Sequence, residues 1–292
     1  MKNIIVMSGD IGSGKSSVAT ELQQLTNFDI IGTGTIQRAI ASKRGLTTLE
    51  LNEISQTDRS IDDEIDAYVI ETGKTQDRLI MDSRLAWHFI PTAFKVFLAV
   101  DPVVGAERVF NASRHDENNA SLDITIKNNL KRQTIEDQRF NQLYNIHFRK
   151  YGNYDLIIDT SYATPLAIAQ KINDCFNAWL KHQNFSSLWI TPRKLLPTLA
   201  ENALYDDAQE LSVFIYNGFI YIQQGHRLVI RTHTANNDLI AANIITEEPN
   251  HLLIDGVTVA EAAHKVSLAM LKDWEDSLGF KYTRYPESVS TQ

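Results

Sequence analysis

The chain has 292 residues, of which 43% are hydrophobic and 22% are charged, and these values are typical of a globular protein rather than a disordered one. Its single cysteine, Cys175, excludes an intrachain disulfide and favours a reducing compartment, so we expect a cytoplasmic protein. The net charge of −8 argues against nucleic acid as a partner of the whole chain. No signal-peptide pattern opens the sequence, and no apolar run approaches the roughly 20 residues that span a bilayer, so we expect a soluble protein without a membrane partner.

Short apolar runs alternate with longer amphipathic segments up to about Lys181. Nearly continuous apolar runs are typical of parallel strands that are covered on both faces, and they occur at Asn3–Ser8, Phe28–Gly32, Arg78–Met81, Val96–Val100 and Leu156–Asp159. The intervening segments predict helices at Lys15–Leu25, Thr35–Arg44, Leu49–Ser55, Ile61–Glu71, Pro102–Ala112, Asp123–Asn145 and Leu166–Leu180. Strand and helix in alternation predict a doubly wound α/β domain over residues 1–182.

The alternation stops near Lys181–Ser187, which we interpret as a linker before a second domain at residues 188–292. Two strand-like runs in this second part flank an Asn-Gly pair, the strongest short-range signal for a β-hairpin. A helix with one apolar stripe follows them. The predicted elements of this small α+β unit are strands at Val213–Tyr216, Phe219–Gln223 and Ile240–Ile245 and a single long helix at Val259–Leu278.

The stretch GDIGSGKSS, from Gly9 to Ser17, matches the phosphate-binding pattern G-x-x-x-x-G-K-[ST]. It follows a predicted strand and opens a predicted helix, which is the context that the motif requires. In such a loop, backbone N–H groups and the helix N-terminus hold phosphate oxygens, Lys15 reaches the β- and γ-phosphates, and Ser16 offers a hydroxyl to Mg²⁺. The predicted cofactors are therefore ATP and Mg²⁺, and the predicted ATP-binding residues are Gly9, Ile11, Gly12, Ser13, Gly14, Lys15, Ser16 and Ser17.

Several arginines follow the ends of predicted strands, where the ligands of open α/β sheets bind. Arg38 lies on the helix after the second strand, and Arg84 follows the third. Arg132 and Arg139 lie seven residues apart, on one face of a long predicted helix. A single arginine on a helix is commonly a solvated charge, but phosphoryl transfer needs positive charge around the moving group, and the joint placement favours that function.

Six blocks of residues 1 to about 175 resemble, in the same order, the short, archaeal-type cytidylate kinases among the nucleoside monophosphate kinases. The blocks are GDIGSGKSS, GTIQRAIASKRGLT from Gly34, IDDEID from Ile61, DSRLAW from Asp82, FLAVDPVVGAERV from Phe97, and LKRQTIEDQRFNQLYNI from Leu130 leading to YDLIIDTS from Tyr154. The resemblance implies a P-loop NTPase three-layer sandwich with a five-stranded parallel sheet and a mobile lid. It also implies transfer of the γ-phosphate of ATP to CMP or dCMP.

The resemblance further implies how the acceptor and the metal are bound. Arg38 and Arg84 match positions that hold the α-phosphate of the acceptor. Asp62 and Asp66 fall in the helical acceptor-binding insert, where we expect them to help read the base. Asp82 closes the strand before Arg84, and we expect it to order Mg²⁺ or its waters, with the hydroxyl of the phosphate loop as the second metal ligand.

The implied catalytic residues are Lys15 and the two lid arginines, Arg132 and Arg139, which would close over the transferring phosphoryl group. Because an acceptor phosphate oxygen is already a nucleophile, alignment and charge neutralisation suffice and no strong general base is needed. The sequence departs from the family at Asp10-Ile11, which replaces the usual Pro-Pro. Since side chains there would point away from the phosphates, we expect the loop to tolerate this change.

The C-terminal part resembles the ParB/sulfiredoxin-like fold through WITPRKLLPT from Trp189 and YIQQGHRLVIRTHTANNDLIAANIITEE from Tyr221. Gly225, His226 and Arg227 lie at a predicted helix start, a turn that in that family often binds nucleotide phosphates. The alternative is that His226 and Arg227 only cap a structural helix.

Three functions are compatible with the sequence. The first is a nucleoside monophosphate kinase with a fused accessory ligand-binding domain and small-molecule nucleotides as its ligands. The second is a P-loop kinase for another small acceptor, and the third is a nucleotide-sensing regulatory protein with vestigial kinase activity. The presence of Lys15, Ser16, Arg84, Arg132 and Arg139 together favours catalysis over sensing.

Overall fold

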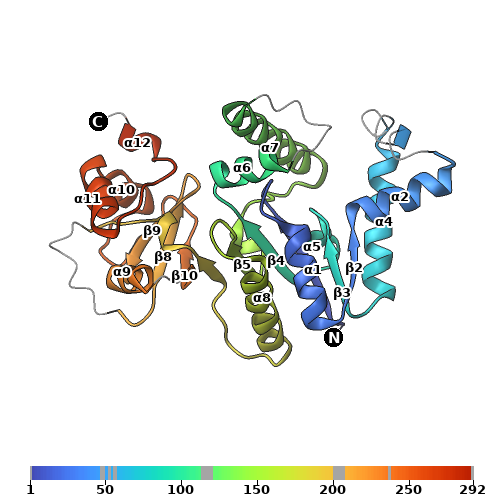
Figure 1. Cartoon of the computed structure of the whole chain (residues 1–292), viewed down its shortest axis with the longest axis horizontal. Helices are drawn as coiled ribbons and strands as arrows, with labels where there is room; N and C mark the ends of the chain where they lie inside the picture. Colours follow the sequence, from blue (N-terminus) through green and yellow to red (C-terminus); the bar gives the residue numbers. More distant parts are fainter. Residues whose placement is uncertain are drawn as a thin grey trace. The chain divides into compact units, whose positions relative to one another are not determined.

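A computed structural model of the whole chain describes residues 2–46, 50–51, 54, 58–112, 121–199, 208–235 and 238–290. These residues form two compact units (Figure 1). The first comprises Met1–Thr160 and Thr164–Phe185, and the second comprises Ser161–Ala163 and Ser186–Gln292. The main change from one unit to the other therefore falls inside the segment that we interpreted as a linker.

The first unit is built on parallel strands in the order β2-β3-β1-β4-β5. The central strand β1 is buried along its whole length, because helices cover both faces of the sheet (Figure 1). Each strand coincides with one of the predicted apolar runs, with small shifts at the ends. The bounds are β1 Ile4–Gly9, β2 Asp29–Gly32, β3 Leu79–Asp82, β4 Phe94–Ala99 and β5 Leu156–Asp159.

Six helices of this unit begin within two residues of a predicted start, and the short helix α5 was not predicted. The predicted helix at Leu49–Ser55 lies largely outside the described residues. α1 packs against α8, and α6 packs against α7 (Figure 1). Asp101 caps α6 by accepting the backbone N–H of Val103 and of Val104. The bounds are α1 Lys15–Thr26, α2 Thr33–Arg44, α4 Ser60–Thr75, α5 Ala86–Phe89, α6 Pro102–Asn111, α7 Leu122–Tyr144 and α8 Pro165–Leu180.

The long helix α7 buries little of its surface. Ser121 caps its N-terminus by accepting the N–H of Ile124, and Thr125 is its one fully buried residue. A helix without a wide apolar face depends on polar side-chain contacts for its position. Polar side-chain contacts between α7 and the rest of the unit therefore determine where the arginines of α7 lie.

The second unit contains a mixed sheet in the order β6-β10-β8-β9-β7. The predicted hairpin is confirmed: β8 and β9 pair antiparallel around Asn217 and Gly218, which both have positive φ, as a type I′ turn requires. The strands are β6 Leu188–Ile190, β7 Leu195–Leu196, β8 Ser212–Tyr216, β9 Phe219–Gln224 and β10 Ile240–Thr246. The helices are α9 His226–Thr234, α10 Val259–His264, α11 Leu268–Leu278 and α12 Glu287–Ser290.

The prediction of one long helix at Val259–Leu278 is wrong, because α10 and α11 are separate helices. Ser267 is extended, with φ −103° and ψ 161°, and its hydroxyl accepts the N–H of Met270 at the start of α11. A serine N-cap stops one helix and starts the next without any Gly or Pro, while the apolar stripe continues through the break. The periodicity alone therefore concealed the interruption.

A fully buried carboxylate ties the end of the described chain to α11. Glu275 accepts the hydroxyl of Tyr285 at 2.6 Å, the N–H of Tyr282 at 2.7 Å and the ammonium of Lys272 at 2.9 Å. Burial by itself would raise the pKa of Glu275, but these hydrogen bonds lower it to about 2. Glu275 is therefore an ionised anchor in the second unit.

Within the described residues, no helix combines the length and the apolar character that crossing a bilayer requires.

Candidate active site

The phosphate-binding motif forms a tight loop between β1 and α1. β1 ends at Gly9, and Gly14 caps α1 in a left-handed conformation with φ 78°. Gly12 also has a positive φ of 79°, and a Cβ atom on it would lie 2.2 Å from the carbonyl oxygen of Gly105 in α6. Only glycine fits so close an approach between two backbones. The strand, loop and helix thus have the arrangement that a P-loop requires.

Lys15, at the first position of α1, is folded back over this loop. Its ammonium donates to the carbonyl oxygens of Gly9 at 3.3 Å and Asp10 at 3.4 Å. Burial, and secondly the charge of Arg84, lower the pKa of Lys15 to about 8, although nearby carboxylates oppose the shift. Because carbonyl oxygens are weak partners for a buried cation, an anionic ligand in the loop would bind this ammonium more strongly.

An open pocket of about 440 Å³ lies beside the start of α1, within the usual size range of small-ligand sites. Five of the predicted site residues line it together: Lys15, Ser16, Arg38, Asp82 and Arg84. The remaining lining residues are Ala19, Thr20, Ile30, Gly32, Gly34 and Thr35. Three cationic side chains against one carboxylate make this pocket suitable for an anion such as a phosphate.

Asp82 and Ser16 bring two oxygen donors to the same pocket. Burial raises the pKa of Asp82, while the charges of Lys15 and Arg84 act in the opposite direction. One carboxylate and one hydroxyl fit Mg²⁺, which usually keeps several waters and binds through one or two protein ligands and substrate phosphates. In the part of the chain that the structure describes, no cluster of three or more His, Cys, Asp or Glu side chains could form a metal centre built from protein ligands alone.

A carboxylate on α7 joins two of the predicted arginines. Glu136 forms a close ion pair through one oxygen with the Nη1 of Arg84, and its other oxygen accepts from the Nε of Arg132 at 3.2 Å. Arg84 comes from the segment after β3, so this carboxylate connects α7 to the pocket. Glu136 was not among the residues predicted from the sequence, although its position four residues after Arg132 on a predicted helix is a recognised signal for an ion pair.

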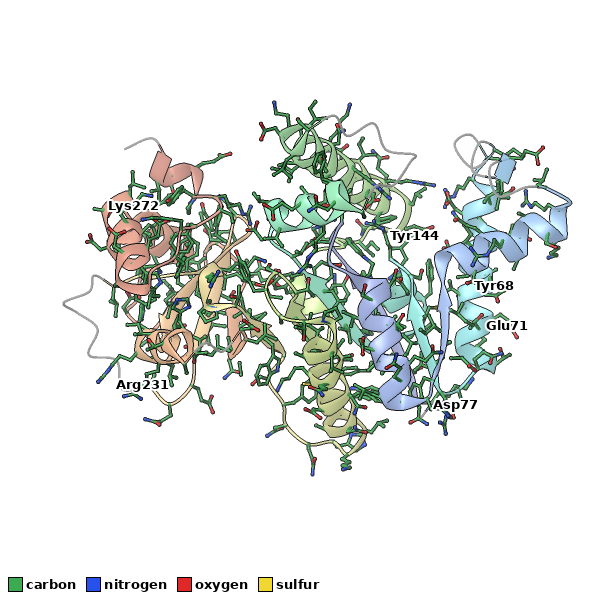
Figure 2. The ribbon with its side chains drawn as sticks, viewed as in Figure 1. Tyr68, Glu71, Asp77, Tyr144, Arg231 and Lys272 are labelled. Carbon is green, nitrogen blue, oxygen red and sulfur yellow. The ribbon has the colours of Figure 1, made fainter. Side chains whose placement is uncertain are left out.

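The other predicted lid arginine contacts the acceptor insert. Arg139 forms a close ion pair with Asp62 of α4, and one turn further along each helix the hydroxyl of Tyr144 donates to Asp66 at 2.6 Å. Figure 2 shows Tyr144 at the end of α7, on the side toward α4. Burial raises the pKa of Asp66, and the hydrogen bond from Tyr144 opposes this shift. Asp62 and Asp66, which we predicted to read the acceptor base, here join α4 to α7 and do not line the pocket.

Asp10 of the phosphate loop is held by several partners. One carboxylate oxygen accepts from the Nε of Arg149 and from the amide of Gln133, each at 3.1 Å, and the other accepts the N–H of Val100 at 3.2 Å. Arg149 also forms a close ion pair with Asp137 of α7. These contacts of Asp10 were not predicted from the sequence. Arg149 lies after the end of α7, where no sequence pattern distinguishes it.

In the second unit the Gly-His-Arg turn starts a helix, as predicted. Gly225 is the N-cap of α9 with φ 100°. His226 is fully buried, its Nε2 accepts the N–H of Thr198 at 3.1 Å, and its ring packs edge-on against Trp274. This histidine therefore contributes to packing, and half-exposed Arg227 is the more accessible polar side chain of the turn.

Comparison with known proteins gives the family. A family model described as an AAA domain matches residues 5–135. A cytidylate kinase of Natronomonas pharaonis is 32% identical over 178 residues, which are 60% of this chain and 90% of that enzyme. This chain belongs to the cytidylate kinase family. It is accordingly an ATP-dependent kinase of nucleoside monophosphates.

Two further similarities are more limited. An S-adenosylmethionine-dependent nucleotide dehydratase of Lacinutrix mariniflava is 35% identical over 173 residues, which are 59% of this chain, and the chain spans 35% of that protein's length. A solved structure of shikimate kinase from Bacteroides thetaiotaomicron has a TM-score of 0.42 and 16% identity, over 62% of this chain and 98% of that one. For a member of the cytidylate kinase family, the pocket beside the P-loop is the candidate active site.

Proposed function

We propose that this protein transfers the γ-phosphoryl group of ATP to CMP or dCMP, giving ADP and the nucleoside diphosphate. The observation that carries the proposal is that Lys15 of the P-loop shares one pocket with Arg38, Asp82 and Arg84. An acceptor phosphate placed against these arginines would lie next to the γ-phosphate of a nucleotide in the loop. The name of the Natronomonas pharaonis relative supports a cytosine nucleotide as the acceptor.

On the ATP side, the backbone of the loop from Gly9 to Gly14 would bind the phosphate chain. The ammonium of Lys15 would move from its present carbonyl partners to the β- and γ-phosphates. This contact would raise the pKa of Lys15 again, because an adjacent anion favours the charged form. Ser17, in the first turn of α1, adds a hydroxyl near the same helix N-terminus.

On the acceptor side, Arg38 and Arg84 would hold the α-phosphate of the monophosphate. An oxygen of that phosphate attacks the γ-phosphorus, a new P–O bond forms, and the bond to the β–γ bridging oxygen breaks, so that ADP leaves with the electron pair. The nucleophile needs no deprotonation by a strong base. The catalytic contribution of the chain is therefore alignment and positive charge, supplied by Lys15 and by Arg132 and Arg139 of α7.

Mg²⁺, when bound, would neutralise charge on the β- and γ-phosphates. Ser16 and Asp82 are the residues that would hold it or order its waters. Asp82 suits this role because it lies at the carboxyl end of β3, where the charges of Lys15 and Arg84 favour the ionised carboxylate. Asp62 and Asp66 would read the acceptor base after α7 releases them.

We propose that the second unit is an accessory ligand-binding domain with a ParB/sulfiredoxin-like fold. Its support is that left-handed Gly225 caps the start of α9 and that the partly exposed Arg227 lies in the first turn of this helix. A small phosphate-bearing ligand fits this combination. His226 would hold the turn in place from inside.

The test is a panel of nucleoside monophosphates, assayed with ATP and Mg²⁺ on the full-length protein by coupled detection of ADP. Rapid turnover with CMP or dCMP, and slow turnover with AMP, GMP and UMP, is the expected result. Lys15→Ala is the control and should reduce transfer by about a hundredfold or more, because it removes charge from the β–γ bridge. Turnover only with another monophosphate would correct the acceptor, and ATP binding without turnover on any acceptor would refute the proposed reaction.

A further inference from the structure

We propose that Glu136 is a positioning residue that competes with the acceptor phosphate for Arg84 and Arg132. Because of this competition, only an acceptor that carries a phosphate group can bind these arginines. The inference rests on the proposed function, since it concerns the same arginines. It assigns a role to a residue that lies outside the phosphate-binding motif and outside the pocket lining.

The geometry of Glu136 is that of a bridging anion. Its two oxygens bind two guanidinium groups separately, one through the Nη1 of Arg84 and the other through the Nε of Arg132. The Glu136 side chain is 18% exposed and that of Arg84 is 24% exposed, so the pair is substantially shielded from water. A carboxylate with one oxygen on each of two arginines has the arrangement of charge that a phosphate oxygen pair would adopt there.

The surrounding charges explain why an anion is needed in this place. Burial lowers the pKa of Arg84, the positive charges of Arg132 and Arg149 lower it further, and Glu136 is the largest influence in the opposite direction. Lys15 is also close enough for Glu136 to favour its charged form. With Glu136 neutral, the cations would repel one another in the empty site, and an incoming phosphate would relieve that repulsion.

The neighbouring acidic residue on the same helix provides a contrast. Asp137 binds Arg149, which is held in turn by Asp10 of the phosphate loop. Asp137 therefore acts on the position of the segment after α7, and its carboxylate makes no ion pair with Arg84 or Arg132 among the described contacts. The role that we assign to Glu136 depends on its side of the helix and is not a general effect of negative charge on α7.

The consequence is selection for a phosphate-bearing acceptor. A nucleoside without a phosphate offers Arg84 no charged partner and leaves the ion pair with Glu136 intact. A monophosphate carries a double negative charge and can replace the single charge of the carboxylate. Binding of the acceptor therefore includes the cost of separating Glu136 from its arginines, and only the phosphate can offset that cost.

The experiment compares Glu136→Gln with the wild-type full-length protein by calorimetric titration with CMP and, separately, with cytidine. Gln keeps the size of the side chain and removes the charge. We expect CMP to bind about five- to tenfold more tightly to the variant, because a charged competitor is lost, while the affinity for cytidine stays the same. Asp137→Asn is the matched control, and its CMP affinity should remain within about twofold of the wild type.

Steady-state kinetics provide the second readout. The KM for CMP should fall in Glu136→Gln, with kcat changed much less, whereas a structural defect would lower kcat and raise KM together. Glu136→Ala, with thermal unfolding of each variant, repeats the test without a polar side chain. Weaker or unchanged CMP binding in both variants, or equal changes for CMP and cytidine, would overturn the inference while the proposed function stands. If the wild type phosphorylates no monophosphate, the proposed function fails, and titration with inorganic phosphate still decides whether the variants bind an anion more tightly.

Discussion

The carboxylate of Asp10 and the Nε of Arg149 lie 3.1 Å apart, which fixes a residue inside the phosphate loop to one beyond the end of α7. The same carboxylate oxygen accepts from Gln133 of α7. The loop is thus connected both to α7 and to the segment after it, through a residue where the family usually has proline. A proline could make neither contact.

Asp10→Ala should lower the free energy of unfolding by about 2–3 kcal/mol, because it leaves the half-buried guanidinium of Arg149 and the N–H of Val100 without this partner. Urea denaturation of the full chain measures the change. Asp29→Asn, at an exposed position of β2, is the control and should change stability by less than about 0.5 kcal/mol. An unchanged midpoint for Asp10→Ala would show that these contacts of Asp10 do not stabilise the protein.

The lowered pKa of Lys15 predicts a dependence of stability on pH. The pKa is about 8 in the folded protein and 10.5 in an exposed lysine, so below pH 8 both states are protonated and folding bears the full cost of burying the charge. As pH rises from about 8 to 10.5, the folded state loses this proton first and stability rises. Lys15→Met should be more stable than the wild type at pH 7, and the difference should shrink over this range. Urea midpoints at several pH values test this, and a difference independent of pH would contradict it.

Arg84→Ala should raise the KM for the acceptor about tenfold or more and leave the affinity for ATP within about threefold, because we propose that Arg84 holds the acceptor phosphate in the pocket that it shares with Lys15. Initial rates with varied acceptor, together with titration of an ATP analogue, separate the two effects. Arg231→Ala in the second unit, labelled in Figure 2, controls for the loss of one surface charge. A large loss of ATP affinity in Arg84→Ala would instead place this arginine on the donor side.

Glu275→Gln should destabilise the second unit by about 2 kcal/mol, because the buried position no longer carries the charge that accepts from Tyr285 and Lys272. The pKa of Glu275 is lowered to about 2 from an ordinary value of 4.5, so its contribution is complete above pH 4.5 and is lost as pH falls toward 2. The fluorescence of neighbouring Trp274 during acid titration reports the change. Equal acid sensitivity of the variant and the wild type would contradict the assignment.

Local patterns predicted the features that depend on contiguous residues. The phosphate loop is one, because its glycines, Lys15 and Ser16 lie together in the chain, and the hairpin at Asn217-Gly218 is another. The parallel strands could be found because burial on both faces produces short apolar runs. The break at Ser267 could not, since a serine cap leaves the apolar periodicity intact.

Contacts between distant segments could not be predicted in the same way. The ion pair between Arg84 and Glu136 joins residues 52 apart, and it depends on how α7 is placed relative to the segment after β3. The contacts of Arg139 with Asp62 and of Tyr144 with Asp66 depend likewise on the approach of two helices. The sequence identified most of the charged groups, but the partner of each group is a property of the fold.

The backbone contact between Gly12 and Gly105 extends the nucleotide site beyond the phosphate-binding motif itself. A methyl group on Gly105 would meet the carbonyl oxygen of Ile11 at 2.7 Å, so an alanine in α6 would push on the loop as directly as a change within it. A prediction of variant effects that considers only residues close in sequence to the phosphate-binding motif would treat substitutions of Gly105 as neutral. Gly105 packs against the backbone of the phosphate loop, so substitutions at Gly105 should weaken nucleotide binding although every residue of the phosphate-binding motif is unchanged.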